Sequence, residues 1–244
     1  MVRLILFLAR HVPQAVIVNS RATAATLPHA RGLVVAAPGF EPAQLTSTPP
    51  QPEQPPVVGI LGRISPTKGQ LVFVQAAALV RDHYPEVRFR IIGQSLFGED
   101  AYAERVRAEV QRLALSDIVE FIGHVTNPMA ELDRLQLCVH ASPTPEPFGQ
   151  VIVEAMVRHI PVVATRGGGA TEIMTPDPGA GPLGWLVEPN DPEGLATAIL
   201  SALDDPADTA ARAGNAFATA SRRYPIAKTA EQITAVWRRV APAR

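Results

Sequence analysis

The sequence has a single cysteine, Cys138, and no uninterrupted apolar run that approaches the ~18 residues of a membrane-spanning helix. One cysteine excludes a disulfide framework within the chain. Cys138 lies inside the apolar stretch LQLCVHA, which is typical of a small buried side chain and suits a reducing compartment. The short apolar segment LILFLA near the N-terminus is predicted to be an ordinary helix, because it is shorter than a signal-peptide core.

The chain also lacks an excess of either charge. Its 23 acidic and 22 basic residues give a net charge of -1 over 244 residues. A protein that binds nucleic acid through a broad basic surface is therefore not expected, and any anion site must be local. Lysine is scarce as well, since only Lys68 and Lys228 occur beside an arginine-rich background. This usage, with abundant alanine, is typical of a GC-rich bacterial gene.

Most of the chain shows the pattern of parallel β-α units. From residue 57 onward, short β-branched runs alternate with longer amphipathic or alanine-rich stretches. We therefore predict an α/β fold, a Rossmann-like parallel sheet with helices on both faces. In such a sheet, ligands bind outside the carboxyl ends of the strands. The predicted strands are residues 57–61, 88–92, 119–122, 137–141, 161–165 and 184–188.

The remaining segments are predicted to have different roles. Residues 1–45 contain too few elements to close a core of their own, namely helices at 2–11 and after Ser20 and strands at 15–19 and 33–37. Residues 46–56 carry five prolines in eleven positions, so they are expected to form an extended linker before the main domain at 57–222. Helices are predicted near 192–203, 206–221 and 227–240, the last within a separate C-terminal segment, 223–244.

The stretch GILGRISPTKG, residues 59 to 69, combines two cations with flanking glycines after the first strand of the predicted sheet. Gly62 allows a ligand to approach the backbone closely, Arg63 offers a planar set of donors, and Lys68 stands at the start of the predicted helix KGQLVFVQAAALV. The cations and the helix N-terminus favour the same ligand, an anion such as a diphosphate. The spacing is not that of P-loop proteins, which argues against a triphosphatase. Surface charge at a helix start is the alternative interpretation.

A second informative stretch is SPTPEPFGQVIVEAM, residues 142 to 156. Glu146 stands between Pro145 and Pro147, whose fixed φ angles restrict the loop, and Glu154 follows eight positions later in a predicted helix. Two carboxylates with free backbone N–H groups between them suit a polyhydroxylated ligand. A proline-stiffened loop with a solvated helical glutamate is the alternative. The backbone groups in question belong to Phe148, Gly149 and Gln150.

Three glycines in ATRGGGATEIM, residues 164 to 174, follow the strand predicted at 161–165. Glycines at this position permit a tight turn from strand to helix close to the ligand cleft. A purely structural turn explains the same residues equally well. Glu172 follows in a short predicted helix.

These motifs together resemble a known family. GRISPTKG, FIGHV, PTPEPFGQVIVEA, ATRGGGATE and GWLVEPNDPEGLATAI occur in the same order in the donor-binding domain of the retaining GT-B glycosyltransferases, group 1, which include bacterial mannosyltransferases and sucrose synthases. The resemblance covers residues 57 to about 240. It extends more weakly over 1–45, where AVIVNSRATAATL and APGFEP are similar to the end of the family's acceptor domain.

The resemblance implies a transferase that moves a hexose from a UDP-, GDP- or ADP-sugar without a metal ion or other cofactor. Arg63, Lys68 and Glu146 are then the catalytic residues. The two cations hold the donor diphosphate and stabilise the charge that develops on it, while Glu146 contacts the transferred sugar near its anomeric carbon. Whether Glu146 is the nucleophile or only a stabiliser of the oxocarbenium-like state stays open.

The same resemblance places further groups around the donor. The two glutamates, Glu146 and Glu154, match a family pair separated by seven residues, and Glu154 is implied to hold the ribose hydroxyls. The backbone near Val125 is implied to border the nucleobase. Gln150 departs from the family, which usually has an aliphatic residue there. The implied donor-binding set is Gly62, Arg63, Lys68, Val125, Glu146, Phe148, Gly149, Gln150 and Glu154.

The resemblance also sets expectations about partners. Members of this fold hold the acceptor on a first domain, most of which has no counterpart in residues 1–45, so we expect a truncated, donor-binding chain. Its partners are a nucleotide sugar, an acceptor saccharide or lipid, and either a separate N-terminal domain or a second copy through weak self-association. A non-catalytic nucleotide-sugar-binding module and a nucleotide-sugar epimerase are the alternatives, although the EPFG loop argues against the epimerase. The expected location is the cytoplasm, with peripheral attachment to the inner membrane face as a variant.

No metal site is expected in the chain. His11, His29 and His83 have no metal-ligand spacing to one another or to Cys138, and no D-x-D pair occurs. His140 and His159 flank apolar strands and are interpreted as structural, whereas His124 in the FIGHV loop could border the base site.

Overall fold

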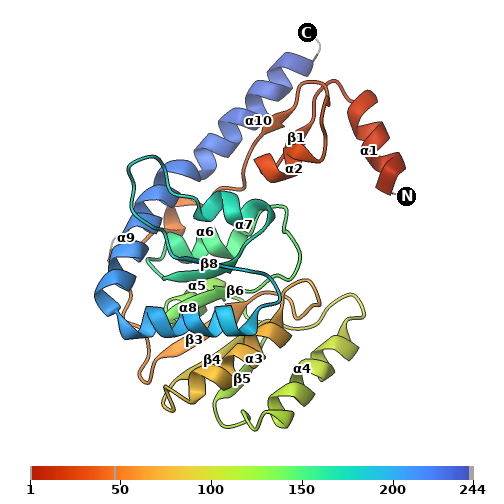
Figure 1. The fold of residues 1–244 in the computed structure, drawn as a ribbon. Helices are drawn as coiled ribbons and strands as arrows, with labels where there is room; N and C mark the ends of the chain where they lie inside the picture. Colours follow the sequence, from red (N-terminus) through yellow and green to blue (C-terminus); the bar gives the residue numbers. More distant parts are fainter. Residues whose placement is uncertain (1, 47, 242–244) are drawn as a thin grey trace.

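The computed structural model describes residues 2–46 and 48–241, and its central feature is a six-stranded parallel sheet (Figure 1). The strand order is β5-β4-β3-β6-β7-β8. All neighbouring strands pair in parallel, which confirms the predicted α/β fold. The strands are β3 (Val57–Leu61), β4 (Arg88–Ile92), β5 (Val119–Gly123), β6 (Leu137–His140), β7 (Val162–Thr165) and β8 (Trp185–Val187).

Helices cover both faces of this sheet, because its strands alternate their side chains between two apolar cores. Val139 of β6 belongs to the core formed with α3, α4 and α8, whereas the neighbouring Cys138 belongs to the core formed with α6, α7 and α9. Burial on both faces explains the nearly continuous apolar strand sequences. The helices are α3 (Gln70–Arg81), α4 (Asp100–Arg112), α5 (Pro128–Leu132), α6 (Gln150–Met156), α7 (Gly168–Met174), α8 (Pro192–Asp204) and α9 (Pro206–Arg223).

The N-terminal segment and the last helix lie together at one end of the protein (Figure 1). Two short strands pair in parallel, and Thr229 of α10 donates a hydrogen bond of 2.7 Å to the carbonyl of Ala37. A β-bridge between Phe40 and Pro225 joins the same two parts of the chain. The elements are α1 (Val2–His11), β1 (Ile17–Val18), α2 (Arg21–Ala25), β2 (Val34–Val35), η1 (Pro42–Gln44) and α10 (Ile226–Val240).

The predicted elements of the sheet are confirmed to within about one residue at each end. The helix predicted from Lys68 was placed too early, because Gly69 caps it in the left-handed region, with φ of 77°, and α3 begins at Gln70. Between 46 and 56, the described residues contain neither helix nor strand. Within residues 2–46 and 48–241, no helix has both the length and the apolar character needed to cross a membrane.

Candidate functional site

The strand order creates a switch point between β3 and β6, which are adjacent in the sheet. The chain leaves β3 toward β4 on one side and leaves β6 toward β7 on the other. The two loops therefore diverge at the carboxyl edge of the sheet, the position at which ligands of such folds bind. The loop after β3 carries Arg63 and Lys68, and the loop after β6 carries Glu146. Two stretches chosen from sequence thus meet at one place.

The centre of the site is a contact between Lys68 and Glu146. The Lys68 Nζ forms a hydrogen-bonded ion pair with Oε1 of Glu146. The same oxygen accepts a hydrogen bond of 2.6 Å from Ser142 Oγ, and the other carboxylate oxygen lies 3.3 Å from His140 Nε2. Only 12% of the Glu146 side chain is exposed, compared with 32% of the Lys68 side chain. The carboxylate is therefore enclosed, and the Lys68 side chain is the more accessible of the two.

These neighbours determine the ionisation of Glu146. Burial alone raises the pKa of its carboxyl, but hydrogen bonding and charge from His140, together with hydrogen bonds from Lys68 and Ser142, outweigh burial and lower the pKa to about 2. Glu146 is consequently a carboxylate at neutral pH. A fixed negative charge at the carboxyl edge of the sheet suits the stabilisation of positive charge on a ligand.

The backbone around Gly69 brings Lys68 to this position. A Cβ added at Gly69 would lie 1.9 Å from the carbonyl oxygen of Ala141, so only glycine lets the start of α3 lie against the end of β6. Gln70, which is fully buried, fixes the preceding loop. Its side chain donates to the carbonyl of Arg63 at 2.9 Å and accepts from the N–H of Ser65 at 3.3 Å.

Arg63 points to a different partner in this structure. Its Nε lies 3.2 Å from Oε2 of Glu99, and its guanidinium lies over the ring of Phe97 at 5.1 Å from the centroid. The same glutamate accepts a hydrogen bond of 3.0 Å from Ser65 Oγ. Arg63 is therefore held against the β4–α4 loop, and Gly62 precedes it with φ of 147°.

The glycine-rich start of α7 holds the Glu146 loop in place. The N–H of Gly169 donates to the carbonyl of Glu146 at 2.8 Å, and a Cβ at Gly168 would lie 2.1 Å from that carbonyl oxygen. The glycines thus hold the backbone of Glu146 in position, in addition to forming a tight turn. Phe148 is anchored as well, since its ring packs edge-on against Tyr224 at 5.6 Å. Gly149 then caps α6 with φ of 102°.

Two predicted donor contacts lie farther from the central ion pair. Glu154 is half-buried on α6, where burial raises the pKa of its carboxyl and a hydrogen bond from Gln150 partly opposes this effect. Val125 is partly buried and packs against the core on the α6 side of the sheet, whereas the neighbouring His124 is exposed. The described residues show no hydrogen bond or ion pair between Glu154 and either Lys68 or Glu146.

The sequence interpretation missed His140, which it assigned to a structural role. The ring ends β6, is almost fully buried, and contacts the predicted catalytic carboxylate. His140 and Ser142 are two positions apart, so an extended chain puts both side chains on the same side. Two polar residues on one side of the chain, shortly before Glu146, were the signal that could have indicated this contact.

The N-terminal segment also contacts the site. Ser20 Oγ donates to the carbonyl of Pro147 at 2.5 Å, and the N–H of Arg21 donates to Glu172 Oε2 at 2.8 Å. Glu172 therefore satisfies the free N–H groups at the start of α2. The start of α2 is thus fastened to the loop that carries Glu146 and to α7.

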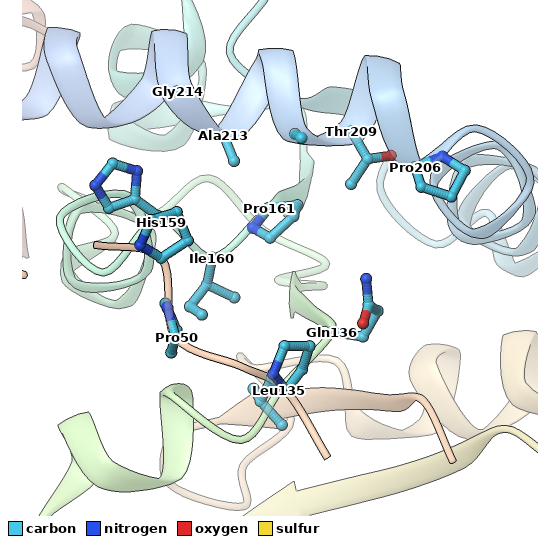
Figure 2. Close-up of a pocket in the computed structure, with 13 residues that line it drawn as sticks. Pro50, Leu135, Gln136, His159, Ile160, Pro161, Pro206, Thr209, Ala213 and Gly214 are labelled. Carbon is cyan, nitrogen blue, oxygen red and sulfur yellow. The ribbon is translucent and has the colours of Figure 1, made fainter. Parts of the chain in front are cut away.

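A separate pocket of about 400 Å³ lies elsewhere on the protein (Figure 2). Gln136 and Pro161 line it and directly precede β6 and β7, so the pocket is at the amino edge of the sheet. Its other walls include prolines of the linker and residues of α9. The pocket is thus opposite to Lys68 and Glu146. In residues 2–46 and 48–241, no three histidine, cysteine or acidic side chains are grouped as a metal site would require.

Comparison with known proteins agrees with this geometry. The family model for Glycosyl transferases group 1 matches residues 45–219. The chain belongs to this family. The predicted resemblance to the C-terminal domain of the GT-B glycosyltransferases of group 1 is therefore confirmed.

Individual group 1 transferases show how much of the fold is shared. The Rhizobium leguminosarum lipopolysaccharide core biosynthesis mannosyltransferase LpcC is 30% identical over 74% of this chain and 50% of its own length. A crystal structure of Anabaena HepE with UDP-glucose is 31% identical, with a TM-score of 0.87 over 98% of this chain and 67% of that chain. Sucrose-phosphate synthase from Thermosynechococcus elongatus is 25% identical, with a TM-score of 0.85 over 98% and 61%. The chain spans about half the length of the curated relatives that it matches.

Proposed function

We propose that this chain binds a nucleoside-diphosphate sugar and supplies the donor side of a retaining, metal-independent hexosyltransferase. The observation that carries the proposal is the contact between Lys68 and the ionised Glu146 at the switch point of the sheet. This contact supports the proposal because a cation suited to a diphosphate lies beside an anion suited to sugar hydroxyls. A nucleotide sugar has these two parts adjacent, because its anomeric carbon is bonded to the second phosphate.

Lys68 is the group that would take the diphosphate. Its ammonium is partly exposed and is held only by the Glu146 carboxylate among the described contacts of its side chain. A diphosphate carries more charge than one carboxylate and can share the ammonium through charge-assisted hydrogen bonds. The Arg63 guanidinium would also bind the diphosphate, by releasing Glu99 and donating to a phosphate oxygen, since Arg63 lies in the same loop as Lys68. The two cations would then stabilise the diphosphate as leaving group, without a metal ion.

Glu146 would face the sugar. Its carboxylate is enclosed and charged at neutral pH, so it can accept hydrogen bonds from sugar hydroxyls and stabilise an oxocarbenium-like centre. The backbone of Phe148, Gly149 and Gln150 would hold the sugar and the distal phosphate. Glu154 would accept hydrogen bonds from the ribose, and the backbone near Val125 would border the base.

The identity of the donor is inferred from the relatives. HepE, at 31% to 32% identity, was solved with UDP-glucose and with UDP, which favours a UDP-sugar for this chain over a GDP- or ADP-sugar. The name of LpcC, a lipopolysaccharide core mannosyltransferase, favours a saccharide or lipid-linked acceptor. Because half or more of these curated relatives lies outside the matched region, transfer would also need an acceptor domain. We place the reaction in the cytoplasm, in keeping with the buried, unpaired Cys138.

Calorimetric titration with UDP, GDP and ADP tests the proposal. We expect UDP to bind, and Lys68→Ala and Glu154→Ala to weaken it about tenfold or more, since each removes a charged hydrogen-bonding partner. Lys228→Ala is the matched control, because it removes the only other lysine of the chain. Absence of binding by any of the three nucleotides to folded protein would contradict the proposal. Binding without transfer, when an acceptor domain is supplied, would favour a non-catalytic module.

A further inference from the structure

His140 is an unusual buried group, because it contacts an anion that the proposed reaction needs. Only 3% of its side chain is exposed, and Nε2 lies 3.3 Å from Glu146 Oε2 and 3.2 Å from Ser142 Oγ. On the other side of the ring, Nδ1 is 3.5 Å from Thr165 Oγ1. The imidazole thus connects the end of β7 to the loop that carries Glu146.

The hydrogen-bonding pattern determines which ring nitrogen carries a proton. An ionised carboxylate only accepts hydrogen bonds. Ser142 gives its hydroxyl proton to Oε1 of Glu146 at 2.6 Å, so it has none to give to His140. The proton between His140 and these two oxygens must therefore come from Nε2. Thr165 Oγ1 donates a hydrogen bond of 2.8 Å to the carbonyl of Ser142, which ties the end of β7 to the segment that follows His140.

The ion pair with Lys68 explains why Glu146 needs a second hydrogen-bond donor. If the donor diphosphate takes the Lys68 ammonium, Glu146 loses one of its hydrogen-bonding partners while it stays enclosed. A buried carboxylate without donors is driven toward its neutral form. His140 ends β6 and Ser142 follows two residues later; both are buried and can keep their contacts with the carboxylate.

We propose that His140 is a positioning residue of the donor-sugar site: its Nε2–H fixes the Glu146 carboxylate toward the sugar and keeps it charged when Lys68 binds phosphate. This inference rests on the proposed function, because it assumes that Glu146 faces the sugar. His140 itself touches neither the sugar nor the phosphates. Its substitution should therefore affect sugar recognition through Glu146 and leave nucleotide recognition nearly intact.

The first experiment follows Glu146 itself in the ligand-free protein. The charged or titratable groups that contact its carboxylate are Lys68, from the loop before α3, and His140, from β6. Carbon-detected NMR of the Glu146 carboxyl should show it ionised throughout the acidic range in which the wild type stays folded. In His140→Met the titration should move to higher pH. In His140→Gln, which keeps an N–H donor of similar reach, it should move less.

The second experiment is a double-mutant cycle on binding. His140→Met and Glu146→Gln should each weaken UDP-glucose by roughly tenfold and change UDP by less than about twofold. In the double variant, His140→Met should add nothing to Glu146→Gln. His140→Gln should recover most of the affinity. His159→Met is the control, because His159 stacks on Phe217 and lines the pocket at the amino edge of the sheet, away from Glu146.

The outcomes separate this inference from the proposed function. An unchanged Glu146 titration in folded His140→Met overturns the inference whether or not any nucleotide binds. Equal loss of UDP and UDP-glucose, or additive losses in the cycle, also overturns it, because a merely structural role would give either result. If Glu146→Gln weakens UDP-glucose but His140→Met does not, only the inference fails. If wild type binds no nucleotide while the carboxyl titration moves as expected, the local role of His140 stands and the proposed function fails.

Discussion

Replacing Glu146 by glutamine should remove a specific part of the dependence of stability on pH. The pKa of this carboxyl falls from its ordinary value of 4.5 to about 2 in the folded protein, in spite of burial, because His140, Lys68 and Ser142 favour the charged form. A lowered folded-state pKa contributes stability that is fully present above pH 4.5 and is lost as the pH falls toward 2. The difference corresponds to about 3 kcal/mol of unfolding free energy.

The assay is urea unfolding of wild type and Glu146→Gln at a series of pH values between 7 and 3.5. The contribution of the carboxylate should be complete at pH 7, and about 1 kcal/mol of it should be lost at pH 3.5. The free energy of unfolding of wild type minus that of the variant should fall accordingly. Because the side chain is 12% exposed, screening by salt should change this difference little.

Glu154→Gln provides a control of opposite sign. Burial raises the pKa of Glu154, so the stability linked to its neutral form is present at low pH and is lost as the pH rises. The difference between wild type and Glu154→Gln should therefore fall with increasing pH. Parallel curves for wild type and Glu146→Gln from pH 7 to 3.5 would refute the reasoning, since Glu146 would then titrate as it does in the unfolded chain.

Two further predictions concern other parts of the protein. Gly69→Ala should lower the free energy of unfolding by at least about 2 kcal/mol, and clearly more than Gly179→Ala does. Both glycines have positive φ, but a Cβ at Gly69 would lie 1.9 Å from the carbonyl oxygen of Ala141, whereas a Cβ at Gly179 would meet nothing within 4 Å. Equal losses in urea unfolding would contradict this reasoning. Phe7 and Trp237 are 59% and 63% exposed, so sedimentation equilibrium should show weak self-association that Phe7→Ser with Trp237→Ser reduces; a wild type that stays monomeric at high concentration would contradict it.

Much of the fold could be predicted because local patterns are strong in this chain. Strands such as 57–61 and 162–165 are short, β-branched and buried on both faces, so they differ clearly from the alanine-rich helices. The rule that ligands bind at the carboxyl edge then directed attention to Lys68 and Glu146. The start of α3 was misplaced because the conformation of Gly69 depends on its contact with β6, which is distant in sequence.

The parts of the site that could not be predicted depend on long-range contacts. His140 looked like a buried strand residue, since nothing in the sequence around it says which loop will cover its ring. Arg63 pairs with Glu99, which lies 36 positions away in the sequence. Glu172 accepts a hydrogen bond from the N–H of Arg21 in α2, which lies 151 positions away. Such pairs arise from the order of strands in the sheet rather than from spacing along the chain.

The sequence by itself determined the class of fold and the residue types that the site would use, because hydrophobic periodicity and glycine, proline and charge positions act locally. Tertiary structure alone decided how those residues are coupled. It put Lys68, His140 and Ser142 around one carboxylate and set its pKa to about 2, since the electrostatic environment of a buried group depends on neighbours that only folding brings together.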